Sequence, residues 1–174
     1  FQALQDRQGF IWIGTEGGGL NRLDPGKGTF IAYSTKDGLS NEMVRDIYED
    51  RDGYLWIGTK NGLNRLKDGK IISISTRQGL YDDVVFRILE DNGDNFWMSC
   101  NKGIFTVSKK ELNDFAEGKT NFFQYTSYDK TDGMKSSECN GGNSPSGCKT
   151  KDGKLCFPTM KGLVIIDPEN IPLN

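Results

Sequence analysis

The sequence predicts an all-β fold, a β-propeller fragment of about four four-stranded antiparallel blades with one short helical insertion. Three observations support this prediction. The motif Asp-x-x-Gly-x-hydrophobic-Trp-hydrophobic-Gly-Thr begins at Asp6 and at Asp50, and degenerate copies follow. Its tryptophans, Trp12, Trp56 and Trp97, are spaced by 44 residues (12 to 56) and 41 residues (56 to 97). Each repeat has room for four short strands, which is typical of a propeller, whereas a solenoid repeat carries one.

The second repeat shows these strands most clearly. Residues 43–50 alternate in character and are expected to form the inner strand. Residues 54–59 are apolar on both faces, so this second strand is expected to be buried on both faces. The third and fourth strands are expected at 63–66 and 70–75, after glycine turns.

The other repeats follow the same order. A third inner strand is expected at 83–89, and a short helix after Ser108, which begins a capping-box pattern that Gly118 ends. The fourth repeat is expected to lack its outer strand, because Pro168 and Pro172 cannot donate the hydrogen bonds of a central strand. The expected blades are 1–36, 37–77, 78–131 and 132–168, with an exit linker at 169–174.

Bulk composition excludes several function classes. The chain of 174 residues carries a net charge of −2 with mixed signs, so a nucleic-acid partner is not expected. No apolar run approaches the ~20 residues of a membrane-spanning helix. The chain has no histidine, which removes the commonest general base and metal ligand and lowers the expectation of an enzyme. Because it opens within a repeat, we expect it to be part of a longer protein.

The aromatic and acidic motifs have structural interpretations. The tryptophans are expected to form the core between blades rather than sugar-stacking platforms, because they recur at one place in apolar strands. Cys156 takes the Trp place in the fourth copy and is expected to be a buried small hydrophobe. The turns at Asp50–Asp52 and 91–95 are too short for a calcium loop that closes with a bidentate Glu. Neither a metal nor a cofactor is expected.

The four cysteines leave two possibilities open. No Cys-x-x-Cys spacing suggests zinc. Cys139 and Cys148 bracket a loop rich in Gly, Ser and Asn and could form a disulfide in an oxidising compartment, whereas free thiols are the default.

The loops that lead into the inner strands are the candidate ligand site. In a propeller, these loops line one mouth of the central funnel, and here they carry polar residues that differ between copies. Their Gly-hydrophobic pairs are interpreted as turns that place Leu39, Leu80 and Met134 between blades. The tentative ligand-binding residues are Asn41, Glu42, Tyr81, Asp82, Asp83, Glu138 and Asn140.

Two strings carry a family resemblance. DRQGFIWIGTEGGGLNRL (6–23) and DGYLWIGTKNGLNRL (52–66) resemble the two-component regulator propeller repeat. The tail, at 132–142 and 152–168, is similar to the last blade before an immunoglobulin-like domain in that family. The resemblance implies a periplasmic sensor part of an inner-membrane protein, with rings that are often seven-bladed and a histidine kinase or diguanylate cyclase as output. It implies the remaining blades and the immunoglobulin-like domain of the same protein as partners.

Three function classes remain open. The favoured one is an extracytoplasmic sensor or ligand-binding segment of a membrane-bound receptor, non-catalytic in itself, that binds a small molecule or oligosaccharide. The second is a glycan-binding or glycan-hydrolysing propeller, for which Tyr81, Asp82 and Glu138 are the candidate residues. The third is a structural dimerisation scaffold. A homodimer is expected, because an open arc of blades would expose apolar faces.

Overall fold

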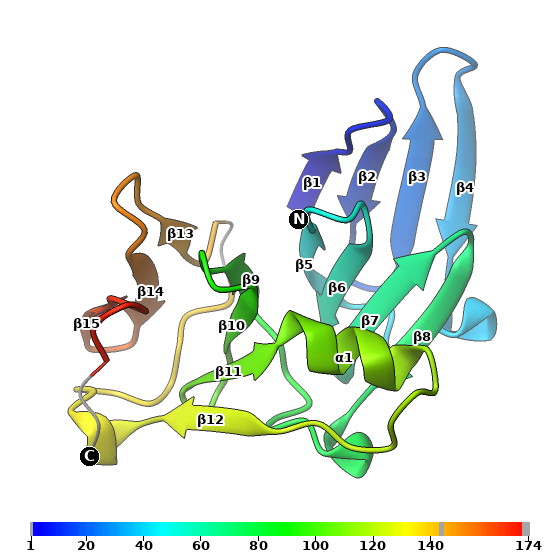
Figure 1. Ribbon diagram of the computed structural model, residues 1–174. Coiled ribbons are helices and arrows are strands. Elements are labelled where there is room, and N and C mark those ends of the chain that lie inside the picture. The colour runs from blue at the N-terminus through cyan, green and yellow to red at the C-terminus, as the bar shows by residue number, and fades with distance from the viewer. Residues whose placement is uncertain (1, 143–144, 172–174) are drawn as a thin grey trace.

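Four antiparallel sheets form the molecule, and they follow one another in an arc (Figure 1). The computed structural model describes residues 2–142 and 145–171. Blade 1 consists of β1 (Gln2–Gln5), β2 (Ile11–Gly14), β3 (Leu20–Asp24) and β4 (Thr29–Tyr33). Blade 2 consists of β5 (Val44–Glu49), β6 (Leu55–Thr59), β7 (Gly62–Lys67) and β8 (Lys70–Ile74). Blade 3 consists of β9 (Arg87–Glu90), β10 (Asn95–Ser99), β11 (Ile104–Ser108) and β12 (Tyr125–Tyr128). Blade 4 consists of β13 (Cys148–Lys149), β14 (Leu155–Thr159) and β15 (Gly162–Ile166).

The strands of each sheet pair in sequence order, so each blade is a simple meander. This confirms the predicted all-β propeller fragment, including a last blade of three strands. Each sheet lies within one of the four expected ranges, although Phe1 and residues 172–174 of the expected linker fall outside the described residues.

The third inner strand is shorter than expected. It begins at Arg87 rather than at Asp83. The backbone N–H of Val85 donates to the carbonyl of Thr59 in blade 2 at 3.0 Å, so this segment bridges two blades before it joins its own sheet.

One helix, α1 (Lys109–Ala116), lies between β11 and β12, where it was predicted. The capping box is not formed, because the Ser108 side chain makes no cap hydrogen bond. Glu111 Oε2 instead accepts the backbone N–H of Gln124 at 2.8 Å, which ties the helix to the segment that leaves it. Leu112 of this helix is fully buried.

Short 3₁₀ helices connect successive blades: η1 (Thr35–Asp37), η2 (Thr76–Gln78) and η3 (Lys130–Asp132). Each has a capping box and ends at a glycine with positive φ, such as Gly38 at 100°. The hydrophobic residue after each glycine is buried, as the Gly-hydrophobic pairs predict; these residues are Leu39, Leu80 and Met134.

The core lies between the blades in three clusters, one for each interface. Trp12, Trp56 and Trp97 lie in these clusters, with exposures of 4%, 0% and 2%. Leu55 and Ile57 of β6 face blade 1 while Trp56 faces blade 3, so β6 is buried on both faces. Among the described residues, none of the helices is long and apolar enough to cross a membrane.

The expectation that Cys156 is a buried small hydrophobe is wrong, because its side chain is half-exposed. Along β14, Leu155 and Phe157 face blade 3 and are buried, whereas Cys156 lies on the opposite face. In each of the other three blades the next blade covers this face, whereas no further sheet follows blade 4 within the described residues.

Candidate functional site

Four of the seven expected ligand-binding side chains form hydrogen bonds within the connections between blades; they are Asn41, Glu42, Asp82 and Asp83. Asn41 Oδ1 accepts the backbone N–H of Met43 at 2.8 Å. Glu42 Oε1 accepts the hydroxyl of Thr35, at the start of η1, at 3.2 Å. Both residues therefore shape the loop that enters blade 2.

The next loop repeats this arrangement. Asp82 Oδ1 accepts the N–H of Val84 at 3.2 Å, and Asp83 accepts both the backbone N–H of Thr76 at 2.7 Å and its hydroxyl at 3.1 Å. Asp82 is also paired with Lys102, whose Nζ lies 3.8 Å from its Oδ2.

The remaining candidates lie further along the arc. Tyr81 packs between the rings of Phe105 and Tyr125, and burial raises its pKa. Asn140 Nδ2 donates to the Thr159 carbonyl at 3.3 Å, and the Glu138 side chain is exposed. Within residues 2–142 and 145–171, no hydrogen bond or ion pair joins the candidates of one loop to those of another.

The disulfide considered between Cys139 and Cys148 is not formed, and all four cysteines are free. Cys139 bridges to Thr159, whereas Cys148 lies opposite Cys156 across β13 and β14. Thr159 and Cys156 are three positions apart on β14, which corresponds to about 10 Å along a strand. A disulfide requires Cα atoms within about 7 Å.

An aspartate clamps the turn between the first two strands in blades 1 to 3. In blade 2, Asp50 Oδ1 accepts backbone N–H groups from Asp52 and Tyr54, both at 2.9 Å, and Oδ2 accepts the indole N–H of Trp56 at 2.8 Å. Equivalent indole bonds join Trp12 to Asp6 at 2.7 Å and Trp97 to Asp91 at 2.8 Å. From the sequence, these aspartates were expected only to form turns. The signal for the indole bond was the constant Asp-to-Trp separation of six residues.

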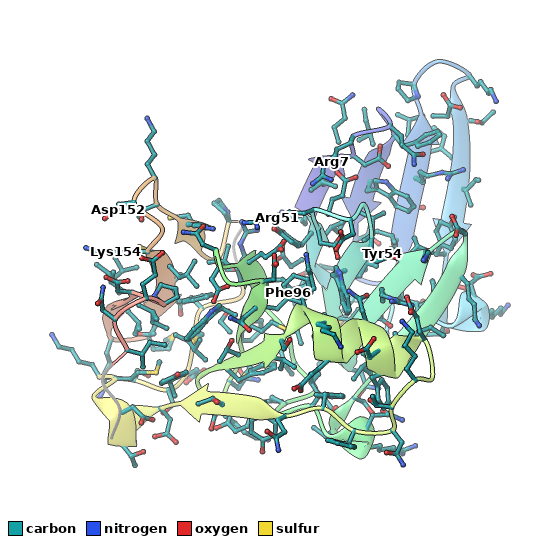
Figure 2. The ribbon with its side chains drawn as sticks, in the orientation of Figure 1. Arg7, Arg51, Tyr54, Phe96, Asp152 and Lys154 are labelled. Carbon is teal, nitrogen blue, oxygen red and sulfur yellow. The ribbon has the colours of Figure 1, made fainter. Side chains whose placement is uncertain are left out.

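A second repeated contact joins neighbouring blades through the residue that follows each clamping aspartate. Arg51 Nε lies 3.9 Å from Glu90 Oε1 in blade 3. Arg7 Nε likewise lies 3.9 Å from Glu49 Oε2 in blade 2, and the Arg7 backbone N–H donates to the same oxygen at 3.1 Å. Arg7 and Arg51 thus occupy corresponding places on successive blades (Figure 2).

The Arg–Glu contact between blades 3 and 4 and the Asp–Trp clamp within blade 4 are both replaced, and in each case both partners change. Asn92 stands in place of the arginine and Lys149 in place of the glutamate, with Lys149 Nζ donating to Asn92 Oδ1 at 2.8 Å. Thr150 and Cys156 occupy the Asp and Trp positions of the clamp. The fourth repeat is therefore held together by different chemistry.

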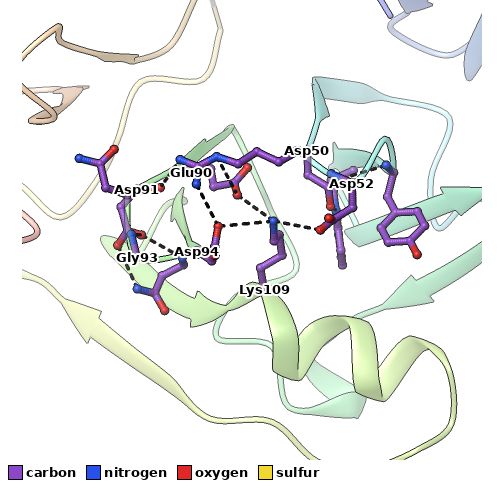
Figure 3. Close-up of polar contacts among 12 residues, drawn as sticks. Asp50, Asp52, Glu90, Asp91, Gly93, Asp94 and Lys109 are labelled. Carbon is purple, nitrogen blue, oxygen red and sulfur yellow. Dashed lines mark hydrogen bonds and ion pairs between the residues drawn. The ribbon is translucent and has the colours of Figure 1, made fainter. Parts of the chain in front are cut away.

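A buried polar network lies where blades 2 and 3 meet the start of α1 (Figure 3). Glu90, which is 4% exposed, accepts hydrogen bonds from the Tyr48 hydroxyl at 2.8 Å and from Lys109 Nζ at 2.9 Å. Lys109 Nζ also lies 3.2 Å from Asp52 Oδ2 and 3.6 Å from Asp94 Oδ1. The lysine ammonium thus joins carboxylates from both blades.

Ionisation in this network favours a charged lysine and a neutral tyrosine. Burial raises the pKa of Tyr48, and the hydrogen bond to Glu90 raises it further. Burial acts to lower the pKa of Lys109, but the hydrogen bonds to Glu90 and Asp52 outweigh it, so this pKa is raised. A cavity of about 450 Å³ borders the network, but its charged groups are already paired with one another. A ligand would have to displace these ion pairs.

A second cavity, of about 600 Å³, lies between blades 1 and 2. Its lining combines aromatic rings with charged side chains. The rings are those of Phe10, Trp12, Tyr33 and Tyr54, and the charged side chains are Arg22, Lys67, Asp6, Glu49, Asp52 and Asp68. Trp12 and Tyr33 are stacked with ring centres 5.9 Å apart, and the Arg22 guanidinium lies 4.4 Å from the Phe10 ring centre. Aromatic rings beside charged groups offer both stacking surfaces and hydrogen-bonding partners to a small polar molecule.

The corresponding place between blades 2 and 3 is filled by α1. There Arg65 takes the position of Arg22, lies 5.1 Å from the Tyr54 ring centre and donates to Asn113 Oδ1 of α1 at 2.6 Å. Blade 2 has only a tight turn at Asp68–Gly69 where blade 3 has the helix. The cavity between blades 1 and 2 is open because no insertion covers it.

Within residues 2–142 and 145–171, no three acidic or cysteine side chains are grouped so that they could hold a metal ion. The clamping aspartates Asp50 and Asp91 already accept three hydrogen bonds or more each.

Comparisons with known proteins agree with this architecture. The two-component regulator propeller pattern matches residues 1–17 and 38–61. The extracellular domain of the putative hybrid two-component system BT3049 from B. thetaiotaomicron superposes with a TM-score of 0.77 and 23% identity, over 96% of this chain and 21% of that one. The extracellular domain of BT4673 from the same organism gives 0.77 and 26%, over 96% and 23%.

A third solved structure resembles the chain in fold alone. Virginiamycin B lyase from Staphylococcus aureus superposes with a TM-score of 0.60 and 16% identity, over 99% of this chain and 55% of that one. The chain thus spans about a fifth of the length of the extracellular domains it matches. No curated protein matches the sequence. The matched repeats and the likeness to these extracellular domains support the two-component regulator propeller family for this chain.

Proposed function

We propose that this chain is an extracytoplasmic sensor segment of a membrane-bound signal-transduction receptor and is non-catalytic in itself. Its ligand is a small polar molecule or an oligosaccharide. The observation that carries the proposal is the open aromatic cavity between blades 1 and 2, in a chain whose blades match extracellular domains of putative hybrid two-component systems. The same likeness supports a location outside the cytoplasm, in the periplasmic part of an inner-membrane protein.

The lining of the cavity supports this ligand class. The faces of Phe10, Tyr33 and Tyr54 are half-buried, so each has an apolar surface that a sugar ring or another flat molecule can cover. Arg22 and Lys67 add hydrogen-bond donors, and Lys67 Nζ already donates to the Tyr54 hydroxyl at 2.8 Å. Stacking surfaces beside charged donors can recognise both faces and edges of a sugar.

Calorimetric titration with neutral and acidic oligosaccharides tests the proposal. A ligand is expected to bind with an affinity that falls by about tenfold or more in Arg22→Ala, which corresponds to the loss of about 1.4 kcal/mol. Lys27→Ala is the matched control, because Lys27 is exposed on the β3–β4 turn and does not line the cavity. Binding that persists unchanged in Arg22→Ala would place the ligand elsewhere, with Tyr81, Glu138 and Asn140 as the next candidates. No binding by any of the oligosaccharides would contradict the ligand class.

A glycan-hydrolysing activity is less well supported by the geometry. Asp82 is 7% exposed, accepts a backbone N–H and is paired with Lys102, so it is not placed to act as a free base. Tyr81 lies between two other rings. We expect no cleavage of a panel of chromogenic glycosides, and cleavage of any of them would overturn the non-catalytic assignment.

The apolar surfaces at the ends of the arc indicate protein partners. Leu163 and Ile165 of β15 are both 60% exposed, and Phe30 of β4 is 66% exposed. Surfaces of this kind mark interfaces. We infer that further blades and an immunoglobulin-like domain of the same protein cover them, or a second copy in a homodimer. Sedimentation of this chain as a monodisperse monomer would contradict the homodimer.

A further inference from the structure

The inner cross-strand pair of blade 4 consists of two cysteines. In each of the other blades, the residue opposite the tryptophan on the innermost strand is large and apolar or aromatic. These pairs are Leu4 with Trp12, Tyr48 with Trp56 and Leu89 with Trp97. In blade 4 the same two positions hold Cys148 and Cys156. Both members of the pair have therefore changed to cysteine.

The geometry of this pair is that of a potential disulfide. Residues directly opposite each other on antiparallel strands have Cα atoms about 4.5–5.5 Å apart, which lies within the range of about 4.4–6.8 Å seen in disulfides. The two side chains lie on the same face. Burial raises the pKa of Cys156, and the charge of Cys148 and a hydrogen bond to the Cys148 thiol raise this pKa further, so the two thiols are in contact. Cys148 is exposed and Cys156 half-exposed, so an oxidant can reach the pair.

The other two cysteines lack this access. Cys100 and Cys139 are both buried, and their thiols point to the carbonyl of Gly103 at 3.3 and 3.5 Å. Burial raises their pKa values to about 12 and about 11, which keeps both as unreactive thiols at neutral pH. They provide internal controls within the same chain.

Blade 4 also lacks the contacts that fix the inner strand elsewhere. β13 has two residues, whereas β1, β5 and β9 have four to six. The Asp–Trp clamp is absent from this blade, because Thr150 and Cys156 occupy its two positions. A covalent bond between β13 and β14 would replace the lost clamp at the same place.

We propose that Cys148 and Cys156 form a disulfide across β13 and β14 when the protein meets a disulfide oxidant such as oxidised glutathione. The supply of oxidant in the cell rests on the extracytoplasmic location proposed above, whereas the reaction itself does not. The Cys148 thiolate attacks the glutathione disulfide and releases one glutathione thiolate. The Cys156 thiolate then attacks the Cys148 sulfur and releases the second. The two cysteines lose two electrons and two protons, one disulfide is reduced, and the two glutathione thiolates take up the protons.

Peptide mapping after incubation with oxidised and reduced glutathione tests the proposal. Trypsin cuts after Lys149, Lys151 and Lys154, so peptide 136–149 separates from peptide 155–161 unless a disulfide joins them. The joined pair is expected, at a mass lower by two hydrogen atoms than the sum of the two peptides. Because peptide 136–149 also contains Cys139, the map is repeated with Cys139→Ser, in which the cross-link is expected to persist.

Two further variants complete the test. Cys156→Ser is expected to abolish the cross-link, whereas the matched control Cys100→Ser keeps it. The cross-link is expected to raise Tm by about 4–8 °C relative to the reduced protein. The proposal is overturned if the protein, with its circular dichroism spectrum unchanged, keeps four free thiols in excess oxidised glutathione, or if Cys148 is found joined to Cys139. Alkylation of thiols in intact cells separates the two claims: a pair that oxidises when purified but is reduced in cells contradicts the location and leaves the disulfide standing.

Discussion

The indole nitrogen of Trp56 donates a 2.8 Å hydrogen bond to Asp50 Oδ2, and both residues are fully buried. At this depth the indole N–H is removed from water, and an unpaired buried donor costs free energy. The carboxylate in turn accepts two backbone N–H groups through Oδ1, so three donors compensate its charge. One side chain thus fixes both the turn and the ring that fills the interface between blades.

Replacing Asp50 with alanine is expected to lower the free energy of unfolding by about 2–4 kcal/mol. The change leaves the Trp56 N–H and two turn N–H groups without their acceptor. Urea unfolding followed by circular dichroism measures the effect. Thr150→Ala, at the same position of the fourth repeat, is the control, and we expect it to cost less than about 1 kcal/mol because no indole depends on it. Equal losses in the two variants would contradict the role of the clamp.

The periodicity of the sequence predicts most of the fold, because each repeat has its own strand pattern and turn glycines. The four strands of the second repeat, the helix after Ser108 and the missing outer strand of blade 4 are all predictable in this way. The spacing alone cannot show that Asp50 reaches the indole six residues later, since a turn aspartate needs no such partner. The capping box predicted at Ser108 does not form, because Glu111 accepts the backbone N–H of Gln124 instead.

The candidate site was less predictable, because it depends on which loops cover which blades. The polar residues of the inter-blade loops were expected to be free to bind a ligand. Glu42 and Asp83 instead accept hydrogen bonds from the hydroxyls of Thr35 and Thr76 in the preceding 3₁₀ helices. The cavity between blades 1 and 2 exists because the helical insertion is absent from blade 2, which is a relation between neighbours rather than a property of one segment. The neighbour of Cys148 was unpredictable for a similar reason, since only the strand register shows that Cys148 lies opposite Cys156.

Replacing Lys109 with methionine is expected to destabilise the protein by about 3–5 kcal/mol. The change removes the ammonium that joins Glu90 to Asp52 and leaves the Glu90 carboxylate buried with only the Tyr48 hydroxyl and the more distant Arg51. Urea unfolding measures the loss.

A double-mutant cycle distinguishes this charge effect from a simple packing change. Glu90→Gln, added to Lys109→Met, removes the unpaired charge, so the double variant is expected to be less destabilised than the two single variants taken together. Strict additivity would show that the two side chains do not act as a pair.

Replacing Cys100 with threonine is expected to change stability by less than about 1 kcal/mol, despite its complete burial. Cys100 occupies the position of Thr59, whose hydroxyl donates to the Gly62 carbonyl at 3.0 Å, and the Cys100 thiol donates to the Gly103 carbonyl at 3.3 Å. Cys100→Val has the same shape as the threonine variant but no donor. We expect it to be less stable than Cys100→Thr by about 1 kcal/mol in thermal or urea unfolding. A valine variant as stable as the threonine variant would show that shape alone matters at this position.

A buried carboxylate on the inner strand of blade 2 makes stability depend on pH. Asp46 is 1% exposed and accepts hydrogen bonds from Arg87 at 3.0 Å and from the backbone N–H of Ile88 at 2.7 Å. Burial raises its pKa to about 6, although Arg87 and the backbone donors act in the opposite direction. In the unfolded chain an aspartate has a pKa of about 3.9.

Between these two values the folded state holds more protons than the unfolded state, so the free energy of unfolding falls as pH rises. The contribution of the neutral Asp46 carboxyl is fully present below about pH 4 and is lost as pH passes through about 6. Asp46→Asn keeps a neutral side chain of similar shape and has no proton to lose. Its stability relative to the unchanged protein is therefore expected to rise by about 2–3 kcal/mol between pH 4 and pH 7, measured by urea unfolding at a series of pH values. Parallel profiles would mean that Asp46 stays ionised throughout, and that the charge of Arg87 outweighs the desolvation of the buried carboxylate.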